Sequence, residues 1–284
     1  MWGLFPLYWT LLSAAGALET LAHRMMWSLF AVVIVLVWSR RFGSFLAVVR
    51  NRRQLGLLAG AAVLISANWG GYIWGVNNGR VVETALGYFT GPIVSVLMGV
   101  LLLGERLRKA QWTAVALGAI AVVVLAVGYG QVPWIALVLA FSFSTYGLVK
   151  KLAGVDAVES MAVETSVTLL PALAYVVILE ASGAGTFTSV SVGHTLLLIG
   201  GGFVTMLPLL AFGAAAVRIP LTMIGLLQYL APILQFAFGV LVFHESMPPE
   251  RWLGFAIVWL ALIILTVDGT RRRPPAALKA EPLP

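Results

Sequence analysis

The sequence predicts an all-α, polytopic membrane protein, with ten transmembrane helices arranged as two inverted five-helix repeats. Three observations support this fold class. Hydrophobic residues make up 61% of the 284 positions and charged residues only 10%, whereas a soluble domain has about 25% charged residues. Ten apolar segments could each cross a bilayer. The two halves of the chain also resemble each other at a constant offset of 140 positions.

Each span is expected where about 20 apolar residues could cross the hydrocarbon core. On this basis the spans lie at approximately residues 1–14, 20–38, 55–77, 81–103, 110–128, 132–150, 160–180, 195–216, 221–243 and 250–268. The first is short, since about 14 residues rise only about 21 Å. We therefore expect the printed chain to begin inside a first helix that is truncated at its N-terminus. The polar, proline-rich residues 271–284 are expected to form a disordered cytoplasmic tail.

A proline-containing apolar run occurs once in each half. Glu83–Glu105 aligns without gaps on Met223–Glu245, which places Pro92 on Pro232. Proline removes one helical hydrogen bond and clashes with the carbonyl four residues earlier, so we expect a helix break at each proline. Irregular backbone at membrane depth is tolerated only against protein or a water-filled cavity. A repeated broken helix of this kind is typical of a transporter binding site.

Residues 1–130 and 131–270 form the two expected repeats. Because five is an odd number of spans, the second repeat must cross the membrane upside down. The charges agree, since one side of the membrane carries 15 of the 18 lysines and arginines and the other only Arg24, Arg80 and Arg251. Positively charged loops face the cytoplasm, which places both termini of this multi-pass membrane protein there. The same distribution explains the net charge of +7 without a nucleic-acid partner.

Polar and aromatic side chains at membrane depth are candidates to line a substrate cavity. Asn68 and Tyr72 share one face of the third span, although a buried asparagine can instead bond a neighbouring helix for packing. Tyr88, Gln228 and Tyr229 precede the two prolines by three or four residues, beside the carbonyls that the prolines free. The expected cavity residues are Asn68, Tyr72, Trp74, Tyr88, Tyr146, Gln228 and Tyr229.

Ionisable groups inside the bilayer are candidates for gating or coupling, because they are costly there. Arg24 aligns with Glu164 across the repeats, and the inversion places them on opposite sides of the membrane, so they are not expected to form an ion pair. His23 is the candidate for proton coupling, since histidine titrates near neutral pH. Alternatively, these side chains reach the interface or are neutralised within the bundle. Glu105 and Glu245 are expected to cap the helices that follow them.

Motifs in both halves carry a resemblance to a known family. They are HRMMWS at 23–28, NWGGYIWGVNNG at 68–79, ALGYFTGP at 85–92, LLLGE at 101–105, AFSFSTYGLVKK at 140–151 and QYLAP at 228–232. The chain resembles the EamA branch of the drug/metabolite transporter superfamily and, within it, the RarD-like permeases. The resemblance implies a ten-helix inner-membrane transporter of small metabolites or drugs that usually acts in export. The RarD-like name comes from an association with chloramphenicol resistance. The shortened first helix departs from the family pattern.

These features together predict a secondary transporter that works by alternating access. A cavity with apolar and aromatic walls and few fixed charges favours neutral, zwitterionic or amphipathic small solutes. The alternative is a channel or a structural membrane subunit. An enzyme is not expected, because the three histidines are scattered and no HExxH or GxSxG motif occurs.

The expected partners are a small-molecule substrate and the lipid bilayer. A coupling proton and a second copy of the chain in a homodimer are left open. The absence of cysteine excludes disulfides, thiol catalysis, iron–sulfur clusters and cysteine-type zinc sites. We expect no cofactor and no metal site.

Overall fold

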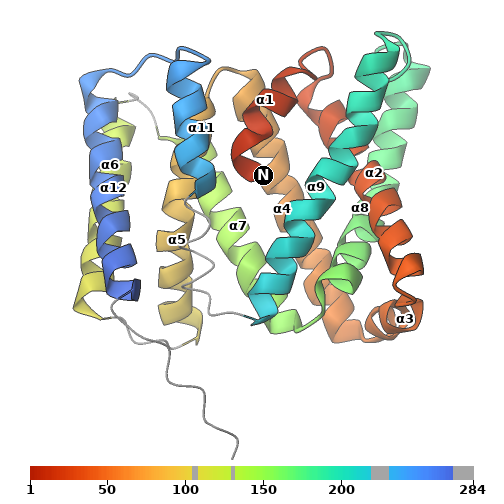
Figure 1. Cartoon of the computed structure of the whole chain (residues 1–284), viewed down its shortest axis with the longest axis horizontal. Coiled ribbons are helices and arrows are strands. Elements are labelled where there is room, and N and C mark those ends of the chain that lie inside the picture. The colour runs from red at the N-terminus through yellow and green to blue at the C-terminus, as the bar shows by residue number, and fades with distance from the viewer. Residues whose placement is uncertain (104–107, 129–131, 219–229, 271–284) are drawn as a thin grey trace, which may run out of the picture.

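The computed structural model describes residues 1–103, 108–128, 132–218 and 230–270, and every regular element in these ranges is a helix (Figure 1). The elements are η1 (Trp2–Leu4), α1 (Phe5–Thr10), α2 (Ala17–Trp38), α3 (Phe42–Arg50), α4 (Arg52–Asn77), α5 (Val81–Leu103), α6 (Lys109–Gly128), α7 (Trp134–Ala153), α8 (Ala157–Ala181), α9 (Val192–Arg218), α11 (Leu230–Leu241) and α12 (Pro249–Thr270). Each expected span therefore contains a helix.

Six helices in the described ranges are long and apolar enough to cross a membrane: α2, α4, α7, α8, α9 and α12. A shorter apolar stretch, Trp112–Leu125, lies in α6. The first expected span forms only the short η1 and α1, and the ninth is described from Leu230 onward. The protein is thus an all-helical, polytopic membrane protein.

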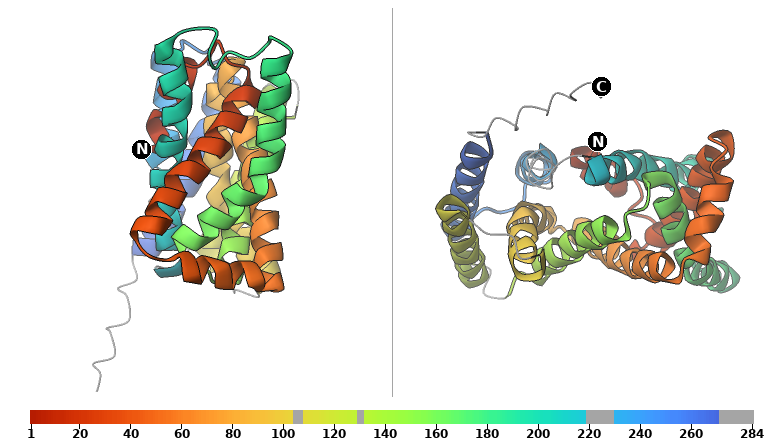
Figure 2. Two further views of the ribbon diagram at one scale, coloured as in Figure 1. Left: turned by 90° about the vertical axis from the view of Figure 1, so that its right-hand side faces the viewer. Right: turned by 90° about the horizontal axis from the view of Figure 1, so that it is seen from below.

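The helices are arranged around a central group (Figures 1 and 2). At one side α2 packs against α8 and α9, and at the other side α6 packs against α12. Between them α7 packs against both α4 and α5, and α5 also contacts α11. The central group therefore combines helices from both halves of the sequence.

Helix α5 corrects the expectation of a break at Pro92. It runs as one helix from Val81 to Leu103 and packs against α7. At Gly87 an added Cβ would lie 2.9 Å from the Ala136 carbonyl oxygen, so α5 and α7 approach closely. Ser144 of α7 also donates a hydrogen bond of 2.8 Å to the Gly91 carbonyl. The carbonyl that Pro92 leaves without its helical donor is that of Tyr88, so the Ser144 bond adds a connection between α5 and α7 and does not replace the lost one.

In the second half, α11 begins two residues before Pro232. The residues that precede this helix, 219–229, lie outside the described ranges. The break expected at Pro232 therefore stays a prediction.

Glu245 caps a different helix from the one expected. Its carboxylate accepts hydrogen bonds from the amides of Val81 at 2.6 Å and Val82 at 2.9 Å, so it caps the N-terminus of α5 rather than the following α12. Exposed amides at a helix start favour a negative charge. Burial nevertheless raises the pKa of the Glu245 carboxyl, against the effect of these hydrogen bonds and of Arg251. Its repeat equivalent Glu105 lies outside the described residues.

Helix α3 was not expected, because its residues belong to the charged segment 39–54. Arg40 has a φ of +56° and separates α2 from α3. The Asn51 side chain then accepts hydrogen bonds from the backbone amides of Arg53 and Gln54, which caps the start of α4. Phe42 is exposed on α3, and a short helix that is apolar on one face and flanked by arginines is typical of a membrane interface.

Candidate functional site

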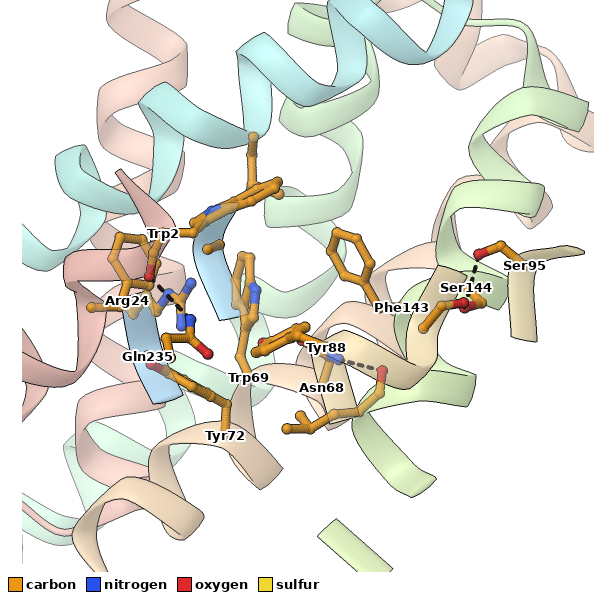
Figure 3. A pocket seen from close by; sticks show the side chains of 15 residues that line it. Trp2, Arg24, Asn68, Trp69, Tyr72, Tyr88, Ser95, Phe143, Ser144 and Gln235 are labelled. Atoms are coloured by element: carbon orange, nitrogen blue, oxygen red, sulfur yellow. Dashed lines mark hydrogen bonds between the residues drawn. The ribbon is translucent and has the colours of Figure 1, made fainter. Parts of the chain in front are cut away.

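A cavity of about 50 Å³ lies among the central helices (Figure 3). Its aromatic walls come from η1, α1, α4, α5 and α7 and are formed by Trp2, Phe5, Trp69, Tyr72, Tyr88 and Phe143. Its polar side chains come from α2, α4, α5, α7 and α11 and are Arg24, Asn68, Ser95, Ser144 and Gln235. Both halves of the sequence therefore contribute to one polar and aromatic site.

Asn68 connects three helices at the cavity wall. Its amide nitrogen donates to the Leu139 carbonyl and to the Ser142 hydroxyl, both at 3.0 Å. Its amide oxygen accepts a hydrogen bond of 3.0 Å from the Tyr88 hydroxyl. Asn68 thus lines the cavity and also holds α4, α5 and α7 together, which fixes the position of the Tyr88 ring.

Arg24 is the charged group of the cavity, and only 2% of it is exposed. Its Nε donates a hydrogen bond of 2.6 Å to the Thr205 hydroxyl of α9. The guanidinium carbon lies 4.0 Å from the ring centre of Trp69 and 4.9 Å from that of Trp9. Such cation–π contacts partly compensate a buried cation for its lost hydration. Arg24 therefore belongs to the cavity itself.

Three buried polar atoms on the cavity wall have no hydrogen-bond partner among the described residues: Nη1 of Arg24, the hydroxyl of Tyr72 and Oε1 of Gln235. The Gln235 amide nitrogen does donate to the Trp2 carbonyl, at 3.1 Å. Buried polar groups are normally satisfied, so each exception calls for an explanation. Two unpaired donors and one unpaired acceptor on one wall are what a ligand site requires.

Two of the expected cavity residues lie elsewhere. Trp74 is 38% exposed and packs against Trp134 with ring centres 5.1 Å apart, so its placement in the cavity is corrected. Tyr146 is buried, but its hydroxyl donates to a Glu164 carboxylate oxygen at 3.0 Å and it does not line the cavity. Gln228 and Tyr229 lie outside the described residues, as do the side chains of Pro92 and Pro232.

Glu164 belongs to a buried polar cluster between α7 and α8. One carboxylate oxygen pairs with Lys150 Nζ at 2.8 Å and accepts a hydrogen bond of 2.7 Å from Ser160, while the other accepts the Tyr146 hydroxyl. As expected, Glu164 does not pair with Arg24. The cluster neutralises Glu164 within the bundle, which was the alternative to a coupling role.

His23 also lies away from the cavity. Its ring stacks on Phe187 with centres 4.6 Å apart. Neither ring nitrogen has a hydrogen-bond partner in the part of the chain that the structure describes. Its role in coupling stays a prediction.

The repeat could have identified one cavity residue that the sequence reasoning missed. Gln235 lies 140 positions after Ser95, and both line the cavity. Lys150 was not among the expected site residues, although it is buried at the end of α7 and pairs with Glu164. Its position four residues after Tyr146, on the same helical face, was the available signal. Among the described residues, no group of histidines, aspartates and glutamates could hold a metal ion.

A bundle of apolar helices around an aromatic and polar cavity is typical of a multi-spanning membrane protein of the permease type. Residues 1–127 match the EamA-like transporter family. Protein RarD of Streptomyces exfoliatus is 59% identical over 99% of this chain and 90% of its own length. Protein RarD of Escherichia coli strain K12 is 38% identical over 96% of this chain and 93% of its own. The chain belongs to the RarD-like permeases of the EamA branch of the drug/metabolite transporter superfamily.

A solved structure supports the fold independently. A chain titled only "Crystal structure of protein" superposes with a TM-score of 0.65 over 95% of both chains, at 20% sequence identity. At this identity the likeness concerns the fold alone.

Proposed function

We propose that this permease is a secondary transporter that exports small neutral, zwitterionic or amphipathic molecules across the bacterial inner membrane by alternating access. The observation that carries the proposal is the cavity with aromatic walls and three buried polar atoms that have no hydrogen-bond partner in the described part of the chain. A transporter needs such a site between helices that can move. Membership of a transporter family favours transport over catalysis.

The size of the cavity indicates a closed state. About 50 Å³ holds only a few water molecules, at roughly 10–15 Å³ of this kind of volume per water. Sites for small organic ligands are typically about 300–1,000 Å³. The helices around the cavity must therefore separate to admit a substrate, as alternating access requires.

Reciprocal contacts support the arrangement of ten helices as two inverted repeats, 1–130 and 131–270. Glu19 and Glu159 are 140 positions apart and begin equivalent helices, α2 and α8. Glu19 accepts hydrogen bonds of 2.6 and 2.9 Å from the amide and hydroxyl of Thr186. Glu159 pairs with Arg41 at 3.1 Å.

Each of these glutamates thus contacts the connection after the second span of the other repeat. The equivalent helices α2 and α8, and α6 and α12, also pack side by side (Figure 1). A pseudo-twofold relation between the repeats explains both observations. With the lysine and arginine distribution, it supports both termini in the cytoplasm and a midplane cavity.

The polar cluster around Glu164 suits a cytoplasmic gate. It joins α7 to α8 close to Lys151 and Asp156, at the end of the bundle that the charge distribution assigns to the cytoplasm. Opening toward the cytoplasm would pull these helices apart and break the Lys150–Glu164 pair. Coupling to protons at His23 remains part of the same proposal.

Transport can be tested in inverted membrane vesicles from a strain that lacks this permease and carries it on a plasmid. A panel of radiolabelled metabolites and drugs, including chloramphenicol, should contain a compound whose uptake is saturable and requires the protein. Tyr88→Ala and Gln235→Ala should each reduce this uptake, because both line the cavity. Trp74→Ala is the matched control, because Trp74 lies outside it.

The alternative function, a channel, gives a different result. Flux would then fail to saturate and would not respond to either cavity substitution. Single-channel conductance of the purified protein in a planar bilayer would confirm the alternative.

A further inference from the structure

The least satisfied group in the cavity is a cation. Arg24 is almost fully buried, and none of the ion pairs found among the described residues involves it. The buried carboxylates near the ends of the bundle are engaged elsewhere: Glu19 with Thr186, Glu83 with Arg80, Glu159 with Arg41 and Glu164 with Lys150. Arg24 therefore lies in the cavity without a protein anion as its partner in the part of the chain that the structure describes.

We propose that Arg24 binds a carboxylate group of the transported molecule, and that the substrates are small amphipathic carboxylates with an aromatic or apolar body. The inference rests on the proposed function and names its substrate class. It selects, from neutral, zwitterionic and amphipathic solutes, those that carry a carboxylate.

The hydrogen-bond inventory of Arg24 leads to this choice. A guanidinium has five N–H donors and matches a carboxylate with two parallel hydrogen bonds. Here Nε is used by Thr205, whereas Nη1 has no partner among the described residues. Burying a charge is costly unless it is paired and hydrogen-bonded. Three aromatic rings within 5.5 Å of the guanidinium carbon reduce this cost but accept no conventional hydrogen bond.

The neighbours of Arg24 fit the same ligand. Figure 3 shows Arg24 and Gln235 next to each other on one side of the cavity, with Tyr72 beside them. The unpaired Tyr72 hydroxyl can donate to the second oxygen of a carboxylate. The unpaired Gln235 Oε1 can accept a hydrogen bond from an N–H or O–H next to that carboxylate, as in an amino acid or an N-acyl amino acid.

The rest of the wall suits an apolar body. Trp69, Tyr88 and Phe143 line the cavity beyond the three polar atoms, and aromatic rings bind other flat rings through offset or edge-to-face contacts. A molecule with one carboxylate and one ring would satisfy the orphaned atoms at one end and fill the aromatic part at the other. A cationic ligand would instead meet the positive charge of Arg24.

The test uses the purified full-length protein in lipid nanodiscs and ligands that differ only in charge. Acetate, acetamide and ethylamine derivatives of phenyl, naphthyl and indolyl rings carry a negative, no and a positive charge on nearly the same body. We expect the carboxylates to bind at least tenfold more tightly than the amides by isothermal titration calorimetry, and the amines to bind most weakly.

Three variants locate the preference. Arg24→Gln should abolish the difference between carboxylate and amide while leaving binding of the amide in place. Arg24→Lys should keep part of it, because lysine retains the charge but not the bidentate geometry. Arg53→Gln removes an exposed arginine outside the cavity and should change nothing. Size-exclusion profiles of all variants should match that of the unmodified protein.

The proposal is overturned if the amides bind as tightly as the carboxylates, if no member of the series binds, or if Arg24→Gln keeps the preference. Counterflow in proteoliposomes separates this result from the proposed function. Saturable flux of an amide without any carboxylate preference would refute the substrate class and keep the transporter. Carboxylate-selective binding without flux of any member would keep the carboxylate site at Arg24 and refute the transport function.

Discussion

The buried pair of Lys150 and Glu164 offers a quantitative test of how the bundle is held together. The two side chains are each 5% exposed, and Nζ lies 2.8 Å from the carboxylate oxygen. At an effective dielectric constant of about 20, unit charges at this distance attract by about 6 kcal/mol. Desolvation of the two ions offsets several kcal/mol of this. Losing one partner leaves the other buried and unpaired.

Glu164→Gln and Lys150→Met should therefore each lower the free energy of unfolding by about 3–5 kcal/mol. The double substitution should cost about 2 kcal/mol less than the two single effects added together, because it leaves no unpaired charge. Glutamine can still accept the hydrogen bond that Tyr146 donates to Glu164.

The measurement is reversible unfolding of the permease in bicelles, monitored with a probe that reports the separation of α7 and α8. Arg53→Gln on the surface is the control and should change the free energy by less than 1 kcal/mol. Single effects that add within about 0.5 kcal/mol in the double variant would refute the reasoning, since independent sites behave in this way.

Three further predictions concern helix contacts. Gly202→Ala should destabilise the protein by about 1–3 kcal/mol in thermal unfolding, because a Cβ there would collide with the backbone of Trp27; an unchanged melting temperature would contradict this contact. Gly60→Ala should instead be neutral or stabilise by up to about 1 kcal/mol, since nothing lies within 4 Å of the added atom. Glu245→Ala should cost about 1 kcal/mol and speed hydrogen exchange of the Val81 and Val82 amides that it caps; unchanged exchange would argue against the cap.

The position of the spans could be predicted from the sequence because hydrophobic length alone decides which segments cross a bilayer. The details at their ends could not. Helix α3 depends on one residue at positive φ, Arg40, and on the Asn51 cap of the next helix, in a segment whose charge suggested a loop. Helix α5 continues through Pro92, and its close contacts with α7 at Gly87 and Gly91 are not revealed by any local pattern.

The candidate site was predictable where helical spacing constrained it. Asn68 and Tyr72 are four residues apart and therefore share a face, and both line the cavity. Trp74 lies six residues after Asn68, a rotation of about 240° around the helix, so the same geometry places it on another face. Trp74 was expected in the cavity because it is aromatic, but its angular position around α4 decides which face it occupies. Applying the phase to Trp74 would have corrected the prediction.

The repeat-equivalent residues Arg24 and Glu164 carry opposite charges and differ in how fully they are satisfied. Among the described residues, Glu164 has three partners, whereas Arg24 has one hydrogen bond and three aromatic faces. An incompletely satisfied buried group in a native structure calls for a specific explanation, and a bound substrate would provide one for Arg24. The loss in free energy of unfolding should thus be smaller for Arg24→Gln than for Glu164→Gln, by about 1 kcal/mol or more. The first substitution removes a costly buried charge, whereas the second leaves Lys150 buried without its partner. Unfolding of both variants in the same bicelles measures the difference. If Arg24→Gln proved the more damaging, its aromatic contacts would be structural, and the case for Arg24 as a substrate ligand would lose its energetic basis.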